Sequence, residues 1–584
     1  MIGLFPQRRR RLTDRAVPGL SGMSNERRRR LTHRALPALG GLALVAGGAG
    51  MVVGAQAQSG SQRTAGQFAQ AWERGDYDAM YGMLDDASQD VHSPREFRAA
   101  YRRAAATATA TGVEAGDPEG ERDGSVAVPI AVQTRVFGTV RAMLRLPVHE
   151  EQVTWGPLLA FPGLRPGEGL ARESEPPERA PLLSRNGRVL AEGLAAARSS
   201  PLGDVAGSIA GTLAPEDTAA ARRALWARGF PRDWPTGQNG LEHALERRLA
   251  GRPGGRLLAG QRVLAQAAPR AAPPVRTTID TRLQEAAVTA LAGRLGGIAA
   301  LDARNGEIRA LAGLAFSGPQ PPGSTFKIVT TTAALEQELV KPSTEFPVET
   351  FALIDGVELQ NANGESCGGS FRNSFAHSCN SVFGPLGVEV GSDALVDASE
   401  RYGWNQPPTV PGEVPSTLPP AEEIETPLEV ASTAIGQFRT LATPLVMASV
   451  AQTIAAGGVR HLPTLALGER TERVRVTSRR IARTVGSLMV DVVEYGTGTA
   501  ASLPRAKVAG KTGTAELEDT RDPETGEIAP SDPSNTDAWF TAYAPAARPE
   551  LAVAVMLVRA GSGGATAAPA AQGVLLAGLQ AAGR

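Results

Sequence analysis

A serine and a lysine stand three residues apart in the segment QPPGSTFKIVTTTAALE, at positions Ser324 and Lys327. The Pro-Gly pair before Ser324 and the apolar residues after Lys327 predict the first turn of a helix. Residues three apart share a helix face, so the lysine can reach the serine hydroxyl. A buried lysine can lose its proton and become the base that a serine nucleophile requires. The alternative is that Ser324 caps the helix and Lys327 is a solvated charge.

Lysine usage favours the chemical interpretation. The 60 basic residues include only four lysines, Lys327, Lys341, Lys507 and Lys511. Arginine therefore serves almost everywhere that a generic positive charge is needed. Arginine cannot give up its proton, whereas a buried lysine can. The few lysines that remain are therefore candidates for roles that arginine cannot fill, and Lys327 is a candidate base.

A second short motif, S-C-N, follows at Ser378–Asn380. The serine hydroxyl can donate and accept a proton, and the asparagine amide can hold a polar substrate group. On its own this motif is common in proteins. It gains weight because it lies in the chain between the Ser324 motif and a third one.

The third motif, K-T-G-T, spans Lys511–Thr514 within the segment VAGKTGTAEL, which predicts a strand. Gly513 allows another backbone to approach this strand closely. Lys511 is a candidate cation for a substrate carboxylate, and Thr512 and Thr514 offer hydroxyl groups. An extended peptide could add to such a strand by main-chain hydrogen bonds. The alternative is an ordinary strand followed by a turn.

The elements that must position these motifs belong to a chain of 584 residues, long enough for two to four domains of roughly 100–200 residues each. Residues 62–156 begin with a helical pattern and continue with alternating strands, which predicts a small α+β domain. Residues 157–272 form a middle region, extended at first and then mostly helical from residue 186. Residues 273–584 alternate strand and helix and contain all three motifs.

The N-terminus differs from the rest in charge. Residues 1–34 carry ten arginines against Asp14 and Glu26, and the remaining 550 residues carry an excess of eight acids. A mildly acidic body does not favour nucleic acid as a partner. Residues 35–57 are almost wholly apolar and long enough to span a bilayer. The positive-inside rule then predicts a single-pass protein with a cytoplasmic tail and an extracytoplasmic body. The alternative is a cleavable signal peptide.

The chain has two cysteines, Cys367 and Cys379, twelve residues apart. In an exported protein they could form a disulfide, or Cys379 could simply be a small buried apolar residue. No group of Cys, His and carboxylate residues has the spacing of a metal site, so we expect neither a metal nor another cofactor.

The three motifs in this order resemble those of the penicillin-binding proteins and related β-lactamases. Residues 273–584 resemble the transpeptidase domain, also in VRTTIDTRLQEAAVTAL, GIAALDARNGEIRALAG and DAWFTAYAP. Residues 62–156 are similar to the NTF2-like domain of monofunctional class B members. The resemblance implies an α+β multidomain fold. Its parts are an NTF2-like domain, a helical and extended middle region related to a dimerisation segment, and a transpeptidase domain whose antiparallel sheet is flanked by helices.

The resemblance also implies a serine D,D-transpeptidase mechanism. Ser324 would attack the D-Ala-D-Ala carbonyl of a peptidoglycan stem peptide, with Lys327 as its base. The backbone N–H groups of Ser324 and Thr514 would form the oxyanion hole. A stem-peptide amine would then take the acyl group, and β-lactams would acylate the same serine.

The remaining residues of the motifs would act on protons and on substrate. Ser378 and Asn380 would relay protons and hold the substrate amide. The group that would bind the substrate carboxylate comprises Lys511, Thr512, Gly513 and Thr514.

Two alternatives remain open from sequence. A β-lactamase or D,D-carboxypeptidase would pass the same acyl group to water. A non-catalytic cell-wall scaffold or β-lactam sensor would bind ligand without turnover. For the transpeptidase, the expected partners are stem peptides, β-lactams, the membrane, and proteins of cell division or of the elongation that sets cell shape, with no nucleic acid.

Overall fold

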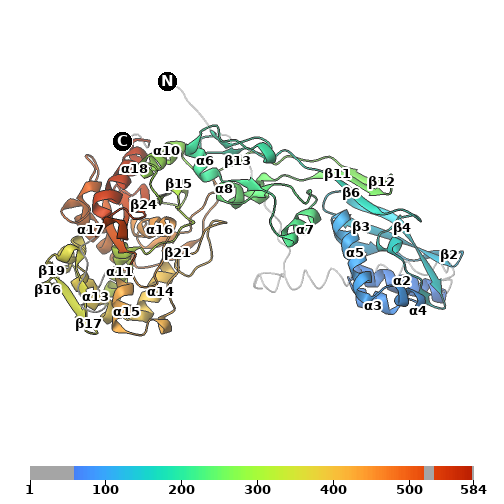
Figure 1. Cartoon of the computed structure of the whole chain (residues 1–584), viewed down its shortest axis with the longest axis horizontal. Helices are drawn as coiled ribbons and strands as arrows, with labels where there is room; N and C mark the ends of the chain where they lie inside the picture. The colour runs from blue at the N-terminus through green and yellow to red at the C-terminus, as the bar shows by residue number, and fades with distance from the viewer. Residues whose placement is uncertain (1–57, 519–531, 582–584) are drawn as a thin grey trace, which may run out of the picture.

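The computed structural model describes residues 58–518 and 532–581 of the chain. The molecule is elongated, with an N-terminal unit at one end, a middle region, and a larger C-terminal unit at the other end (Figure 1). The basic segment 1–34 and the apolar segment 35–57 lie outside the described residues. Within the described part of the chain, no helix is long and apolar enough to cross a membrane.

The N-terminal unit packs four helices against one face of an antiparallel sheet. Its helices are α2 (Gly60–Glu73), α3 (Tyr77–Gly82), α4 (Asp86–Val91) and α5 (Pro94–Ala108), and its strands are β1 (Ala110–Ala115), β2 (Glu119–Arg122), β3 (Ser125–Thr134), β4 (Gly138–His149) and β5 (Gln152–Val153). The strand order is β1-β3-β4-β5, with β2 also paired to β3. Alternate residues of β3 are buried, as the period of two in its sequence predicts.

Aromatic side chains fill the core of this unit. Phe97 and Tyr101 of α5 lie against Trp155, and all three side chains are buried. The Trp155 indole N–H donates to the Tyr101 hydroxyl at 3.2 Å. The one polar contact between these rings therefore pairs the buried indole N–H with the buried hydroxyl.

The middle region connects the two units by short elements. They are β6 (Leu170–Glu175), β7 (Leu182–Leu183), β8 (Val189–Ala191), α6 (Asp204–Ala210), β9 (Leu213–Ala214), α7 (Ala219–Ala227), β10 (Thr236–Gly237), α8 (Gly240–Ala244), α9 (Glu246–Leu249), β11 (Gly254–Ala259), β12 (Arg262–Ala267) and β13 (Val275–Arg276). The prediction that residues 186–270 are mostly helical is wrong: α6, α7, α8 and α9 are short and are separated by turns and strands, and beyond residue 253 β11 and β12 form a hairpin. Because β11 also pairs with β6, tertiary pairing outweighs the helix propensity of this Ala-, Arg- and Leu-rich sequence.

A buried group of charged residues holds the middle region together. Arg179 contacts Glu242 at 2.6 Å and Glu246 at 2.8 Å, and Arg198 contacts Glu242 at 2.7 Å. The Arg179 and Glu242 side chains are at most 1% exposed. Arg179 and Arg198 each meet at least one carboxylate, whereas the buried Arg172 of β6 contacts a hydroxyl and carbonyl oxygens instead.

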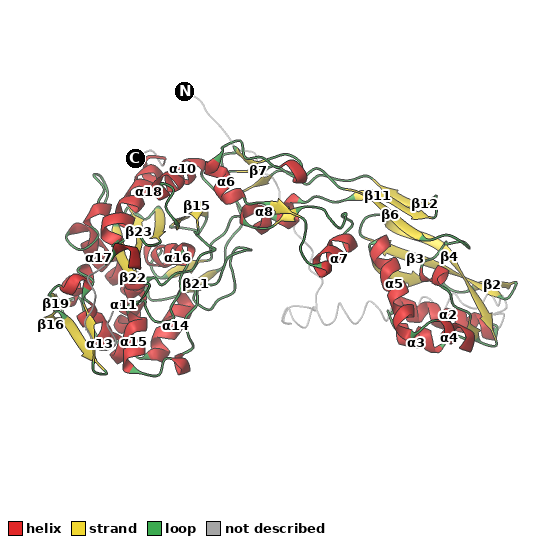
Figure 2. Ribbon diagram, viewed as in Figure 1, coloured by secondary structure: helices red, strands yellow, loops and turns green. Residues whose placement is uncertain are grey.

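The C-terminal unit is built on a five-stranded antiparallel sheet with helices on both faces (Figure 2). Its strand order is β15 (Ile308–Gly313), β14 (Gly296–Asp302), β24 (Leu551–Leu557), β23 (Thr536–Ala544) and β22 (Ala509–Glu516). Helices α10 (Thr281–Leu291) and α18 (Ala568–Ala581) cover one face, and α16 (Pro444–Ala455) packs on the other. β22, which carries the K-T-G-T motif, is an edge strand.

The remaining helices of this unit surround a central one. They are α11 (Lys327–Glu336), α12 (Phe371–Ala376), α13 (Asn380–Val390), α14 (Ser392–Tyr402), α15 (Pro427–Ala434) and α17 (Arg479–Glu494), and the short strands beside them are β16 (Glu345–Glu349), β17 (Phe351–Ile354), β18 (Val357–Gln360), β19 (Cys367–Ser370), β20 (Val459–His461) and β21 (Arg473–Arg475). Residues 327–335 of α11 are buried on every side. A helix buried all round is a core helix, so whatever polar groups it carries must find partners inside the protein.

Candidate active site

Ser324 lies in a single 3-10 turn, Gly323–Phe326, that leads directly into α11. Gly323 has φ of +51° and donates its N–H to the Gly436 carbonyl at 3.0 Å. The Thr325 hydroxyl donates to the Pro322 carbonyl at 2.7 Å. No side chain caps this turn or α11, so Ser324 is not a helix cap. The turn instead presents a half-buried serine at the start of a buried helix.

Lys327 is fully buried and uses its ammonium group inside the protein. Its Nζ donates to the Ser378 carbonyl at 2.7 Å and to Oδ1 of Asn380 at 2.6 Å. A third contact, to Oγ of Ser378, measures 3.3 Å. Burial and then the nearby charge of Lys511 hold the pKa of Lys327 well below its ordinary value. The alternative that Lys327 is a solvated surface charge is therefore wrong.

The second motif lies in the connection between α12 and α13. Ser378 adopts the left-handed backbone conformation with φ of +62°, which is uncommon for a residue other than glycine. Its neighbour Cys379 is joined by a disulfide to Cys367 at the start of β19, with 5.4 Å between the two Cα atoms. The Asn380 amide donates to the Gln360 carbonyl at 2.8 Å. The disulfide and this hydrogen bond fix the two residues that follow Ser378.

The third motif brings a second buried lysine to the same place. Lys511 on β22 donates from Nζ to Oγ of Ser378 at 2.8 Å and to the Thr512 carbonyl at 3.1 Å. Burial lowers the pKa of Lys511 to about 7. The Ser378 hydroxyl is thus within hydrogen-bond distance of both lysines, and it joins the three motifs into one polar network.

Two glycines allow the edge strand to lie directly against the Ser324 turn. A Cβ added to Gly323 would lie 2.8 Å from the Thr514 carbonyl oxygen. A Cβ added to Gly513 would lie 2.7 Å from the Pro322 carbonyl oxygen. Both distances are too short for a real side chain. Gly513, predicted as a position of close backbone approach, therefore sits where β22 contacts the serine turn.

The electrostatics of the cleft are unusual because neither lysine has a counter-ion. Among residues 58–518 and 532–581, no carboxylate forms an ion pair with Lys327 or Lys511. A buried ammonium without a counter-ion favours its neutral form. A neutral lysine beside a serine is a base, and a second lysine near its pKa at neutral pH can bind an anion or exchange a proton. The arrangement suits acyl transfer by a serine nucleophile.

One predicted contact is absent. Lys327 forms its hydrogen bonds with Ser378 and Asn380. The Ser324 hydroxyl forms no hydrogen bond with any described residue. Hydrogen bonds of catalytic groups are often long or unformed without substrate, so this geometry does not remove Ser324 as the nucleophile. The structure otherwise brings the predicted site residues of the three motifs to one cleft. The oxyanion-hole role of the two backbone N–H groups remains a prediction.

Sequence reasoning missed Thr497. This residue follows α17, and its hydroxyl lies 2.5 Å from the Thr512 hydroxyl. It stands in the stretch YGTGTA, whose glycines indicate a turn and nothing more specific. The two residues are fifteen positions apart, and they meet because α17 packs against β22. No local sequence pattern predicts such a contact.

Comparisons with known proteins agree with this geometry. Residues 296–576 match the family described as penicillin binding protein transpeptidase domain, and residues 60–168 match the NTF2-like N-terminal transpeptidase domain. Peptidoglycan D,D-transpeptidase PbpA of Mycobacterium tuberculosis is 34% identical over 300 residues, which is 46% of this chain and 56% of that protein. This chain therefore spans about half the length of the curated relatives that it matches.

Solved structures are similar over a larger part of the chain. The crystal structure of PBPA from M. tuberculosis has a TM-score of 0.55 and 26% identity, and covers 69% of this chain and 100% of that one. The imipenem acyl-enzyme complex of penicillin-binding protein A from the same organism has a TM-score of 0.55 and 26% identity, with 69% and 99% covered. Both are similar to this chain in fold and in sequence.

Proposed function

We propose that this chain is a class B penicillin-binding protein and a peptidoglycan D,D-transpeptidase, since residues 296–576 match the transpeptidase domain family and residues 60–168 match the NTF2-like N-terminal domain family. Such an enzyme cross-links stem peptides in cell-wall synthesis through a serine acyl-enzyme. The observation that carries the proposal is the network in which Lys327 and Lys511, both buried and without a carboxylate partner among the described residues, meet at the hydroxyl of Ser378.

In the proposed acylation, Oγ of Ser324 attacks the carbonyl of the penultimate D-Ala of a stem peptide. Neutral Lys327 accepts the serine proton as the bond forms. The tetrahedral intermediate then collapses, the peptide bond to the terminal D-Ala breaks, and the leaving amine receives a proton. The contacts of Lys327 with Ser378 support a relay in which the Ser378 hydroxyl carries that proton.

The substrate is held by the edge strand. Lys511, in its protonated form, binds the terminal carboxylate, with the Thr512 and Thr514 hydroxyls beside it. Thr497 orients the Thr512 hydroxyl through their 2.5 Å contact. The Asn380 amide, held by the Gln360 carbonyl, faces the substrate amide. Backbone N–H groups of Ser324 and Thr514 stabilise the oxyanion.

In the second half-reaction, the amine of a neighbouring stem peptide attacks the acyl-enzyme and releases Ser324. A β-lactam would acylate Ser324 and remain attached. The similarity to a protein that was solved as an imipenem acyl-enzyme supports this assignment. The departure of the acyl group to an amine rather than to water is the step that separates a transpeptidase from a carboxypeptidase or β-lactamase.

We further propose that residues 35–57 anchor the protein in the cell membrane, with residues 1–34 in the cytoplasm and the catalytic unit outside. The 21 apolar residues from Ala35 to Ala55 and the arginines before them support this arrangement. Proteins of cell division or elongation are proposed partners within that setting.

The reaction is tested with the purified full chain, a donor stem peptide ending in D-Ala-D-Ala, and an amine acceptor peptide. We expect released D-Ala to match cross-linked product, and both to vanish in Ser324→Ala. D-Ala release without cross-linked product would identify a carboxypeptidase. Steady turnover of benzylpenicillin would identify a β-lactamase, and a Ser324→Ala chain that still cross-links would end the proposal.

A further inference from the structure

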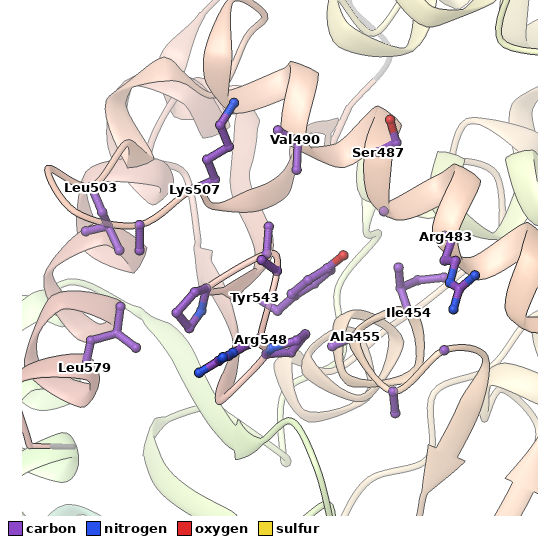
Figure 3. A pocket seen from close by; sticks show the side chains of 18 of the residues that line it. Ile454, Ala455, Arg483, Ser487, Val490, Leu503, Lys507, Tyr543, Arg548 and Leu579 are labelled. Carbon is purple, nitrogen blue, oxygen red and sulfur yellow. The ribbon is translucent and has the colours of Figure 1, made fainter. Parts of the chain in front are cut away.

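A large pocket lies beside the start of the edge strand β22, away from the network of Lys327, Ser378 and Lys511. Its volume is about 1420 Å³. Figure 3 shows its walls, which come from the end of α16, one face of α17, the segment before β22, the β23–β24 turn and the last turns of α18. Drug-sized ligands occupy pockets of roughly 300–1,000 Å³, so this one has room for a long-chain molecule.

The rim of the pocket is strongly cationic. The charged residues that line it are Arg479, Arg483, Arg505, Lys507 and Arg548. Lys507 is paired with Glu494, whereas the four arginines form no ion pair within the described part of the chain. No described residue that lines the pocket is acidic. A concave surface lined by one sign of charge concentrates the opposite sign, so the pocket favours an anion.

The floor of the pocket is apolar. Ile454, Val490, Leu503, Leu576 and Leu579 line it together with several alanines. Leu576 is 41% exposed, which is unusual for a leucine on a helix that otherwise packs on the sheet. The pocket therefore combines a cationic rim with a hydrocarbon surface, and its ligand must be apolar at one end and anionic at the other.

Tyr543 adds a polar group that lacks a partner. Its side chain lines the pocket and is only 5% exposed, with the hydroxyl next to Gly486 of α17. In the described residues, the Tyr543 hydroxyl makes no hydrogen bond. Burial raises the pKa of Tyr543 to about 12, so the hydroxyl stays protonated and can donate. The hydroxyl faces the pocket and can donate to an acceptor that a ligand brings.

From these features we propose that the pocket binds an anionic amphiphile: a phosphate or carboxylate head group among Arg483, Arg548 and Tyr543, with its hydrocarbon chain along α17 and α18. A lipid-like molecule fits better than a peptide segment. The guanidinium groups of the rim can only donate hydrogen bonds, and the Tyr543 hydroxyl can donate one as well. Ser487 already accepts from Arg372. A peptide would bring backbone N–H groups to a wall of donors.

The test uses the full chain in phosphatidylcholine nanodiscs and a dodecyl phosphate that carries a diazirine in its chain. After irradiation and proteolysis, mass spectrometry locates the adducts. We expect them within residues 482–490, 503–507 or 574–580. Unlabelled dodecyl phosphate should prevent labelling, whereas neutral dodecyl maltoside and inorganic phosphate alone should not.

Variants distinguish binding at the proposed site from non-specific binding of the probe. Arg483→Glu combined with Arg548→Glu should lower labelling at least tenfold, and Tyr543→Phe should lower it several-fold. Arg480→Glu is the matched control, because Arg480 is exposed on the same helix but does not line the pocket. It should change labelling less than twofold. The three arginines are exposed, and Tyr543→Phe removes only the hydroxyl of a buried side chain, so an unchanged melting temperature checks that each variant is folded.

Any one of four outcomes would overturn the proposal. Adducts outside the pocket, or equal labelling of the charge-reversed variant, would mean that the pocket is not the site. Equal displacement by dodecyl maltoside would make it an apolar surface without preference for anions. Stronger displacement by an acidic amphipathic peptide of leucine and glutamate than by dodecyl phosphate would make it a protein-binding groove.

Discussion

Buried charge is handled in two opposite ways in this molecule. In the middle region, Arg179 and Arg198 both contact Glu242, and Arg179 also contacts Glu246. In the catalytic cleft, Lys327 and Lys511 contact a hydroxyl, an amide and carbonyls, but no carboxylate within the part of the chain that the structure describes. The first group is neutralised, and the second is left without a counter-ion.

The difference separates architecture from chemistry. A buried ion pair with complete partners keeps its charge and holds two segments together, although replacing it by apolar residues often costs little. A buried ammonium without a counter-ion tends to lose its proton. Such a group is typical of a site where the neutral amine has a chemical role. The cleft therefore has the property expected of a catalytic site, and the middle region has the property expected of a structural joint.

The substitution with the largest expected effect on acylation is Lys327→Arg. Arginine keeps a charge in the same place but cannot serve as a base, so the rate constant for acylation by benzylpenicillin should fall about a thousandfold, within the range that general-base catalysis supplies. Stopped-flow kinetics measure it, and Lys327→Met should fall comparably. The control is Lys341→Arg, at an exposed lysine of the same unit. A Lys327→Arg protein acylated within tenfold of wild type would refute the role of Lys327 as base.

The converse experiment is Glu242→Gln in the middle region. It leaves Arg179 and Arg198 buried with less counter-charge, so the free energy of unfolding should fall by about 3 kcal/mol, the scale for breaking a buried pair. Denaturant titration measures this loss. Glu173→Gln, at the exposed pair with Arg256, should cost less than about 1 kcal/mol. Acylation of folded Glu242→Gln protein should stay within twofold of wild type; a larger change would mean that the middle region acts on the cleft.

The smallest effect is on pH dependence. Lys511 has a pKa of about 7 and must be protonated to bind a carboxylate, so kcat/KM should decline as pH rises through about 7. Lys327 must be neutral, so the same constant should rise as pH increases through its own lowered pKa. Lys511→Arg stays cationic at every pH tested, and the decline above pH 7 should disappear while the maximum changes less than about tenfold. An unchanged alkaline decline in Lys511→Arg would assign it to another group.

Much of the cleft was predictable from sequence because three short motifs carry it. The rarity of lysine indicated Lys327, and the helix start at Ser324 and the strand around Lys511 are local patterns. What could not be predicted is which atoms meet. Ser378 and Lys511 are 133 positions apart, and their contact depends on the packing of α12, α13 and β22. For the same reason, Lys327 contacts the second motif instead of the serine on its own helix.

The fold shows the same division. The strand alternation of β3 and the helix that ends before Gly251 were legible in the sequence. The hairpin β11–β12 was not, because its Ala-, Arg- and Leu-rich residues favour a helix and only pairing with β6 makes them extended. Where the secondary-structure propensity of the residues agrees with tertiary packing, the sequence predicts the element correctly. Where the two disagree, packing determines the secondary structure.

We propose Ser324 as the nucleophile, although the hydroxyl that lies within reach of both lysines in this structure is that of Ser378. The most direct test is to treat the full chain with benzylpenicillin and locate the added mass by peptide mass spectrometry. We predict one penicilloyl group, on Ser324, and none in Ser324→Ala. An adduct on Ser378, or an undiminished adduct in Ser324→Ala, would contradict the account.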